Sequence, residues 1–474
     1  LGDVYKRQVL FRQFSTDYIH KNILGLNLNS GIGQTVVSLK NVNSSDPYKA
    51  GEFSKDLQSI FFFIAAKKLS FLSRDKDIKL NGWLFNYFPN RPAIIVTHGI
   101  NPNGKCKSES NLVASLLVKK NFNVLTIDLR NYGNPEGLPS ARKLGALILN
   151  SNYDETHALD NSSLTLMHQI ISCSFFLGFK NSKLSKESKI ICPVPGYDRH
   201  FKLLENFGIQ MITVPFQDDG PDLDAIEHLL KSEDNIHGIV CVPRHSNPTG
   251  HTYSDENVKA LFKLAQPYKN NFSFFWDNAY ACHDLYETIE QTPIDQIAKD
   301  HDMENNYFQV GSTSKITLAG AGISFFSSSK SNLDTFIDFR NAITPGPNKM
   351  NQGLHMKYFE AISLENQMDG LKNVIKPKFD LVDSCLKPLQ DNELCTYVKP
   401  TGGYFFSFNS TRNNADEIID SCSKLGLKLM PLGACFPYQK DPTNNNIRLA
   451  PTFPDIATLE RCIKIFTNVV KYLN

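Results

Sequence analysis

Three short stretches decide the fold of this chain: His245-Ser-Asn-Pro-Thr-Gly250, Trp276-Asp-Asn-Ala-Tyr280 and Ser312-Thr-Ser-Lys315. They combine the amine of Lys315, the carboxylate of Asp277 and the neutral donors Asn247 and Tyr280. A pyridine cofactor that withdraws electrons needs these groups: an amine for its aldehyde, an acid for its ring nitrogen and donors for its ring oxygen. Each stretch alone is typical of a turn, a polar loop or a strand end. Their joint occurrence predicts a pyridoxal-phosphate site.

These motifs resemble those of the fold-type I pyridoxal-phosphate enzymes, in the class I and II aminotransferases, and most closely a divergent subgroup of bacterial aspartate aminotransferases. The likeness runs from about residue 131 to the C-terminus. It implies a homodimer in which Tyr132, within Asn131-Tyr-Gly133, reaches the cofactor phosphate of the neighbouring subunit. It also implies that Tyr197 stacks on the pyridine ring. A core tyrosine would give the same local pattern.

The resemblance further places the phosphate beside four serines. Ser312 and Ser314 flank the lysine, while Ser162 and Ser163 stand where the family begins its phosphate-binding helix. Free backbone N–H groups and the helix dipole at such a start favour a dianion, although an ordinary N-cap would suit the same serines. Most relatives carry an arginine eight residues after the lysine, and this chain has Ile323 instead. The phosphate therefore loses a bidentate charged partner.

A substrate site is implied near the end of the chain. Ile447-Arg448-Leu-Ala-Pro451 resembles the motif whose arginine binds the substrate α-carboxylate, with Asn247 beside it. A planar guanidinium suits that task, and a solvated arginine on a strand is the competing interpretation. We expect transamination between an acidic, aspartate-like amino acid and a 2-oxo acid, with Lys315 moving the Cα proton. Lys349 is a possible second cation, but a solvated lysine fits equally well.

Other reactions remain open from the sequence. A carbon–sulfur lyase or a decarboxylase of the same fold would share every residue named above, so the products formed from aspartate and 2-oxoglutarate would separate them. A hydrolase would need a serine nucleophile in G-x-S-x-G, and the chain contains no such motif. An inactive chimera that carries a truncated hydrolase segment is the third alternative.

Composition narrows the class of protein. The 474 residues include 50 basic and 48 acidic side chains, so no basic surface for nucleic acid is indicated. The apolar run Ile60 to Ala66 is too short to span a bilayer. The ten cysteines lack C-x-x-C pairs and His/Cys ligand spacing, which argues against a structural metal and against a secreted disulfide scaffold. We therefore expect a cytoplasmic enzyme without a metal, nucleic-acid or membrane partner.

The chain changes character near residue 130. A strand at about 78–85, a strand at 92–97 that leads into His98-Gly99, a helix at 108–120 and a strand at 123–130 resemble the opening of an α/β-hydrolase. The nucleophile elbow that should follow is missing. We infer that two unrelated fragments were joined at Asp128-Leu-Arg-Asn-Tyr-Gly133, and the opening residues 1–8 resemble a cloning remnant. A genuine fusion is the competing interpretation.

The expected fold class is α/β. Apolar strands that alternate with helical stretches predict a large, mostly parallel sheet over residues 131–345, which would bind the cofactor. An interdomain helix and a smaller α+β domain should occupy 346–474. An ill-defined extension at 1–73 and the incomplete hydrolase-like fragment at 74–130 would precede them. The site should lie at the carboxyl ends of the parallel strands.

Overall fold

The computed structural model describes residues 135–344 and 346–473 in full, and it describes four earlier strands by their backbone alone. The chain consists of two compact units, residues 1–133 and residues 134–474. In the first unit, the four strands form one sheet in the order β1-β2-β4-β3, with β3 and β4 parallel. Their bounds are Lys67–Leu72 (β1), Lys79–Phe85 (β2), Ala93–Thr97 (β3) and Asn123–Ile127 (β4).

Strands β2, β3 and β4 lie in the segments where the sequence predicts strands. The helix expected at 108–120 and the loop after His98-Gly99 fall outside the described residues. The hydrolase-like interpretation of this fragment therefore stays a prediction.

The second unit is built on an eight-stranded sheet in the order β5-β12-β11-β10-β9-β6-β7-β8. The central pairs β11·β10, β10·β9, β9·β6 and β6·β7 are parallel, and the outer strands β5, β12 and β8 pair antiparallel. This is the mostly parallel sheet that the alternating strands and helices predict. The strands are Thr156–Ala158 (β5), Lys189–Val194 (β6), Gln210–Gln217 (β7), Gly220–Pro221 (β8), Ile236–Cys241 (β9), Ser273–Asp277 (β10), Tyr307–Ser312 (β11) and Ser324–Ser327 (β12).

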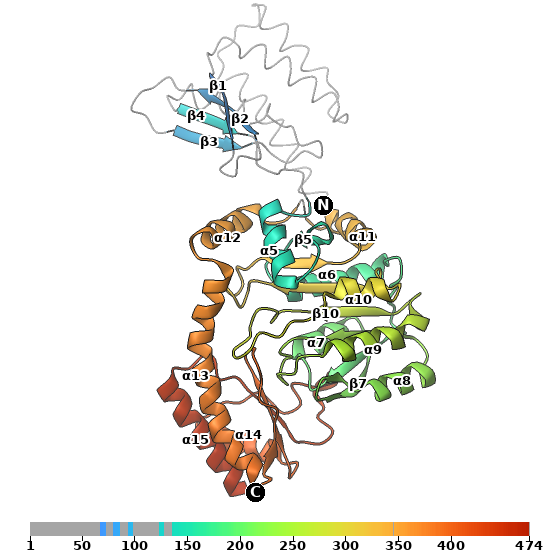
Figure 1. Ribbon diagram of the computed structural model, residues 1–474, viewed down its shortest axis with the longest axis vertical. Coiled ribbons are helices and arrows are strands. Elements are labelled where there is room, and N and C mark those ends of the chain that lie inside the picture. Colours follow the sequence, from blue (N-terminus) through green and yellow to red (C-terminus); the bar gives the residue numbers. More distant parts are fainter. Residues whose placement is uncertain are drawn as a thin grey trace, which may run out of the picture. The chain divides into compact units, whose positions relative to one another are not determined.

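Helices cover both faces of this sheet (Figure 1). They are Pro139–Leu149 (α5), Ser163–Phe176 (α6), Asp198–Asn206 (α7), Leu223–Ser232 (α8), Asp255–Ala265 (α9), Ile294–Asp300 (α10) and Lys330–Asn341 (α11). The central strands are buried on both sides, which explains why their sequences are nearly continuous apolar runs.

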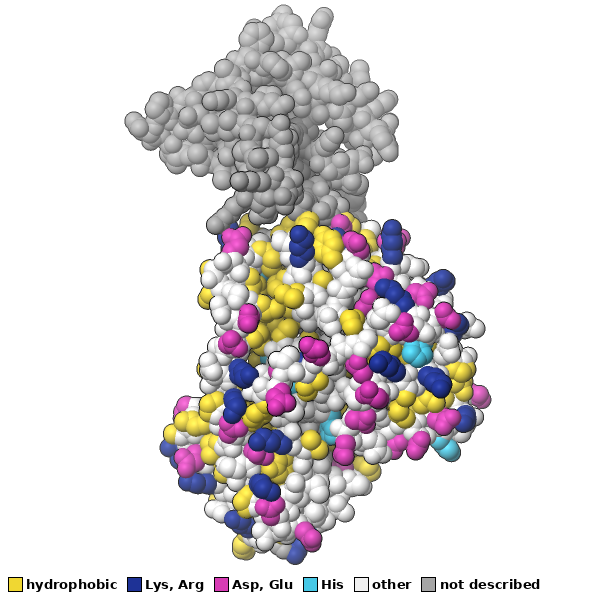
Figure 2. All heavy atoms as spheres, viewed as in Figure 1, with side chains coloured by type: hydrophobic (Ala, Val, Ile, Leu, Met, Phe, Trp, Pro, Cys, Tyr) yellow, Lys and Arg dark blue, Asp and Glu magenta, His cyan; other side chains and the backbone are white. Residues whose placement is uncertain are grey.

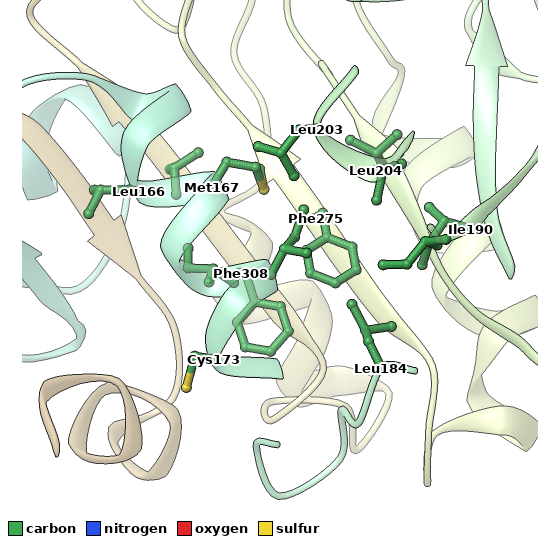
Figure 3. Close-up of a cluster of buried hydrophobic side chains, with 14 of the residues drawn as sticks. Leu166, Met167, Cys173, Leu184, Ile190, Leu203, Leu204, Phe275 and Phe308 are labelled. Carbon is green, nitrogen blue, oxygen red and sulfur yellow. The ribbon is translucent and has the colours of Figure 1, made fainter. Parts of the chain in front are cut away.

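Strand β10 shows how the alternation of a strand builds two cores. Phe274 and Trp276 point into the cluster formed with α8, α9 and α10, whereas Phe275 points into the cluster formed with α6 and α7. Figure 3 shows Phe275 and Phe308 packed beside Met167 in this second cluster. Successive side chains of a strand face opposite sides, so Asp277 lies on the same side as Phe275. The acidic residue is therefore directed toward α6 and α7.

After the sheet, the stretch predicted as one long helix contains two: α12 (Lys349–Ala361) and α13 (Leu364–Asp391). The side chain of Ser363 accepts a hydrogen bond from the N–H of Asn366 and so begins the second helix. A smaller α+β domain follows, with the antiparallel sheet β13-β14-β15 packed against α13, α14 and α15. Its elements are Cys395–Thr396 (β13), Phe406–Ser410 (β14), Ala415–Lys424 (α14), Asn446–Leu449 (β15) and Ile456–Leu473 (α15).

The three decisive motifs follow three adjacent parallel strands. The loop with Asn247 comes after β9, Asp277 is the last residue of β10, and Ser312, the last residue of β11, leads directly to Lys315. Carboxyl ends of parallel strands meet at one edge of a sheet, which is where open α/β sheets bind their ligands. The topology therefore gathers these side chains at one place.

Candidate active site

Asp277 forms a buried pair with a histidine of α7. Its Oδ2 lies 2.9 Å from Nε2 of His200, and both side chains are only 3% exposed. The other carboxylate oxygen, Oδ1, is buried and has no hydrogen-bond partner among the described residues. A buried carboxylate oxygen without a partner is costly, so its position indicates a donor that belongs to a ligand. Asp277 thus has one oxygen fixed by the protein and one left for a protonated group.

Lys315 lies next to this carboxylate, in a partly buried position. Its Nζ is 4.6 Å from the centre of the Tyr280 ring, and its carbonyl accepts a 2.9 Å hydrogen bond from the hydroxyl of Tyr404. Burial lowers the pKa of the Lys315 amine from its usual value, while the charge of Asp277 opposes that change. A lowered pKa increases the share of neutral, nucleophilic amine near neutral pH.

Arg448 reaches the same site from β15 of the small domain. Its Nη1 donates to Oδ1 of Asn247 at 3.1 Å and to Oδ1 of Asp198 at 3.2 Å, and its guanidinium lies 4.9 Å from the centre of the Phe405 ring. Its Nε is buried and lacks a partner among the described residues. Arg448 is therefore an ordered cation with a spare donor, which excludes the solvated arginine that the sequence left open.

A partly buried network supports the loop that carries Asn247. Asp284 accepts a hydrogen bond from Nε2 of His245 at 2.7 Å and from Nη2 of Arg244 at 2.6 Å. A Cβ added to Gly402 would lie 2.5 Å from the His245 ring, so only glycine lets the small-domain segment pass this close. The network therefore connects the Asn247 loop, the segment after β10 and the small domain.

The predicted phosphate serines gather at the start of α6. Ser162 is the N-cap of this helix, since its Oγ accepts from the N–H of Thr165, and Ser163 is its first residue. Oγ of Ser314 donates to the carbonyl of Asn161 at 3.0 Å, which brings the lysine loop against the helix start. Ser312 ends β11 nearby in the sequence and is buried. The ordinary N-cap and the predicted phosphate site are therefore compatible, because the cap uses one N–H and leaves others of the first turn.

One feature limits the charge available at this helix start. Ile323 is fully buried against Ala141 and Ile148 of α5, so the position that carries an arginine in most relatives contributes packing alone. Tyr132, the predicted donor from a neighbouring subunit, lies outside the described residues.

Tyr197 begins α7 and lies beside the buried pair. Its ring centre is 4.8 Å from that of His200, and the ring packs against Tyr280 at the edge of a small cluster that also contains Val242. Burial, followed by the nearby charge of Asp277, raises the pKa of Tyr197 to about 12. The ring therefore stays neutral and flanks the space above Asp277.

Sequence reasoning missed four residues of the site: His200, Tyr404, His283 and Asp284. His200 had a local signal, because it follows Tyr197 by one helical turn and shares its face. His283 and Asp284 follow Tyr280 closely in the sequence. Tyr404 comes directly after the two glycines Gly402 and Gly403. Their roles come from contacts between distant segments, which no local pattern reveals.

Comparisons with known proteins agree with this geometry. The family model of aspartate amino-transferase matches residues 101–473, and the chain belongs to this family. The match begins before residue 131, where the sequence motifs begin. A putative aminotransferase of Mycolicibacterium smegmatis is 38% identical over 343 residues, covering 71% of this chain and 80% of the relative. An aspartate aminotransferase of Corynebacterium glutamicum is 38% identical over 342 residues, covering 70% and 78%.

A solved structure extends the comparison to the fold. The crystal structure of a putative aminotransferase from Corynebacterium diphtheriae superposes with a TM-score of 0.70 at 37% identity, covering 73% of this chain and 86% of that one. The chain is thus an aminotransferase with the fold-type I architecture that its motifs predict. Among the described residues, no helix is long and apolar enough to cross a membrane.

Proposed function

We propose that the chain is a pyridoxal-phosphate-dependent transaminase that moves an amino group between an aspartate-like amino acid and a 2-oxo acid. The observation that carries this proposal is the buried Asp277, whose Oδ1 has no partner among the described residues. The charge of the same carboxylate acts on the pKa of the Lys315 amine. A protonated pyridine nitrogen supplies the donor that Oδ1 needs, and Lys315 supplies the amine that binds the aldehyde.

The described residues fit the rest of the cofactor. Asn247 and Tyr280 would donate to the ring oxygen, Tyr197 would cover a face of the ring, and the α6 start would hold the phosphate. The serines that would take part there are Ser162, Ser163, Ser312 and Ser314. The bound cofactor would supply an electron sink for the Cα carbanion. Because Ile323 offers no charge, hydroxyls and backbone N–H groups carry the phosphate in this chain.

Lys315 would move the proton at the substrate Cα. Burial lowers the pKa of this amine, so it can accept a proton near neutral pH more readily than an exposed lysine. The Tyr280 ring under the amine stabilises the charged form that results. Burial favours the neutral amine and the Tyr280 ring favours the charged amine. The two effects together suit a group that gains and loses a proton in each cycle.

Arg448 would bind the substrate α-carboxylate. The buried Nε of its guanidinium has no partner among the described residues, so this donor is left for a substrate carboxylate beside the existing contact with Asp198. Aspartate is favoured because the relative from Corynebacterium glutamicum is named an aspartate aminotransferase. The group that binds the substrate side chain is not assigned: Lys349 lies at the start of α12, where burial lowers the pKa of its amine, and its role stays a prediction.

We also propose that the protein is a cytoplasmic homodimer. Exposed apolar side chains lie on α12 and in the loop after Lys315: Leu318 is 64% exposed, Met350 77% and Leu354 60%. Met350 and Leu354 are one helical turn apart, and Asn351 of the same helix donates to the carbonyls of Ala321 and Gly322 in that loop. Figure 2 shows apolar side chains grouped over α5 and α12. A second copy would cover this surface.

All nine cysteines of the described part are free thiols, which suits a reducing compartment such as the cytoplasm.

Leu354→Glu should convert the dimer to a monomer, because it places a charge in the centre of the apolar surface on α12. Sedimentation velocity of parent and variant measures the change. Phe453→Glu is the matched control, since Phe453 is 97% exposed in the small domain and lies on neither α12 nor the Lys315 loop. A dimer that persists in Leu354→Glu would move the interface elsewhere.

Lys315→Ala should abolish the covalent link to pyridoxal phosphate, because Lys315 is the lysine on whose amine Asp277 acts in the described part of the chain. The measurement is visible absorption of the purified protein with added cofactor, followed by borohydride reduction and peptide mapping. Lys330→Ala, an exposed lysine at the start of α11, should behave as the parent. Cofactor fixed on another lysine in Lys315→Ala would refute the assignment.

Arg448→Lys should raise the aspartate concentration needed for half-saturation far more than it weakens cofactor binding, because an ammonium cannot reproduce the forked guanidinium contact. A loss of about ten-fold or more in substrate affinity corresponds to about 1.4 kcal/mol. Titration of the cofactor-loaded proteins with aspartate gives the affinities, and Arg461→Lys on α15 serves as the exposed control. Equal affinities for Arg448→Lys and the parent would place the carboxylate site elsewhere. β-Alanine and CO₂ formed from aspartate would instead show a decarboxylase, and a thiol, ammonia and pyruvate formed from an S-alkyl cysteine would show a carbon–sulfur lyase.

A further inference from the structure

One end of the Arg448 guanidinium is occupied by two oxygens of the protein. Nη1 donates to Oδ1 of Asn247 at 3.1 Å and to Oδ1 of Asp198 at 3.2 Å. The other edge, formed by Nε and Nη2, has no hydrogen-bond partner in the described part of the chain. Because these two nitrogens carry parallel N–H bonds, the edge fits one carboxylate in a bidentate contact. The protein thus fills one end of the arginine and leaves a fork for a single carboxylate.

Asp198 brings a negative charge to this arginine. It is the first residue of α7, where the helix dipole favours an ionised carboxylate. Its Oδ1 contacts Arg448, and its Oδ2 lies 3.7 Å from Nε of Arg199. The side chain of Arg199 is exposed, so water screens its attraction to Asp198. The carboxylate of Asp198 is only 26% exposed, so a part of its field remains at the site.

The charge of Asp198 also reaches the ring that flanks the cofactor space. Burial, then the charge of Asp277 and then that of Asp198 raise the pKa of Tyr197 to about 12, while Arg199 and Arg448 oppose them. Tyr197 lies beside the space above Asp277. A ligand in this space therefore experiences the attraction of Arg448 together with the repulsion of Asp198.

The two substrates of a transaminase that acts on acidic amino acids differ in net charge. The amino acid carries two carboxylates and one ammonium near neutral pH, so it has one net negative charge. The matching 2-oxo acid carries the same two carboxylates and no ammonium, so it has two. A fixed negative charge beside the site repels the oxo acid more strongly than the amino acid.

We propose that Asp198 is a specificity-determining residue of the carboxylate site at Arg448: it lowers the net positive charge of that site and weakens the binding of dianionic 2-oxo acids more than that of acidic amino acids. This inference rests on the proposed function and deepens it. An amino acid and its oxo acid share their carbon skeleton, so shape alone separates them poorly, whereas charge separates them. A weaker hold on the oxo acid helps this product leave after the amino group has been transferred.

The first test measures the affinities of succinate and succinamate for the purified full-length chain, by isothermal titration calorimetry at pH 8 and low ionic strength. Succinate is a dianion, succinamate is a monoanion of the same length, and neither has an amine that could react. Asp198→Asn keeps an accepting oxygen for Nη1 but removes the charge. It should bind succinate about three- to ten-fold more tightly than the parent, the scale of one partly screened charge, and succinamate should gain less.

Two further variants test whether the effect belongs to the charge at this place. Asp198→Glu keeps the charge and should bind succinate as the parent does. Glu155→Gln is the matched control, because Glu155 forms a 3.1 Å ion pair with Lys299 and is 21% exposed. Its carbonyl accepts from the N–H of Ser328, whose Oγ donates to Tyr307 at the amino end of β11, the opposite edge of the sheet from the site. An equal gain in succinate affinity in Glu155→Gln and Asp198→Asn would overturn the proposal.

Arg448→Lys separates a failure of this inference from a failure of the proposed function. It should lose about ten-fold or more in succinate affinity, because an ammonium lacks the fork. An unchanged affinity would refute the carboxylate site at Arg448 and this inference with it. A loss in Arg448→Lys without a gain in Asp198→Asn would overturn the role of Asp198 alone, since Asp198 would then only hold the arginine in place. Thermal unfolding of each variant checks that it folds.

The second test uses the cofactor-loaded enzyme. Asp198→Asn should lower the KM for 2-oxoglutarate more than the KM for aspartate, and oxaloacetate should inhibit the reaction at a several-fold lower concentration than in the parent. Added salt should reduce both differences, because it screens a partly exposed charge. Equal changes in the two KM values would overturn the proposal.

Discussion

The hydrogen-bonded pair of Asp277 and His200 is the constraint on which the site depends. A carboxylate at the end of a central strand cannot stay buried without partners, because desolvation of a charge is costly. His200 supplies one partner at 2.9 Å and leaves Oδ1 unpaired. This arrangement requires α7 to lie over the carboxyl end of β10. It also fixes Tyr197, one turn earlier on α7, beside the same space.

The small domain completes the site, and its chain passes close to the large domain at Gly402. Gly402 passes the His245 ring and pairs with Asp284, and the chain then delivers Tyr404 to the Lys315 carbonyl. Arg448 enters from the neighbouring strand β15 and meets Asn247 of the large domain. Cation, base and acid therefore come from two domains that meet where Gly402 packs on the His245 ring and pairs with Asp284. Substitutions at this contact would act on all three.

The sequence was sufficient for the sheet and for the residues that follow its strands. Lys315, Asp277 and Asn247 could be predicted because each comes at the end of an apolar run, and adjacent parallel strands place their ends together. The partners of His200 and His283 could not be predicted, because the first pairs with a residue 77 positions away and the second contacts Tyr404 on another domain. The division of the predicted long helix into α12 and α13 depends on a single N-cap, Ser363, within a continuous helical pattern.

We propose that Asp277 is the charged partner of a protonated cofactor ring. The most direct measurement is the rate of the cofactor absorbance change when aspartate is mixed with the loaded protein in a stopped-flow instrument, for the parent, Asp277→Asn and Asp295→Asn. Asp295 is the matched control, since it is also a buried aspartate with an unpaired Oδ1 but belongs to α10. We expect a rate about a hundred- to a thousand-fold lower in Asp277→Asn, the scale typical of the removal of a central electrostatic partner, and a parent-like rate in Asp295→Asn. A parent-like rate in Asp277→Asn would contradict it.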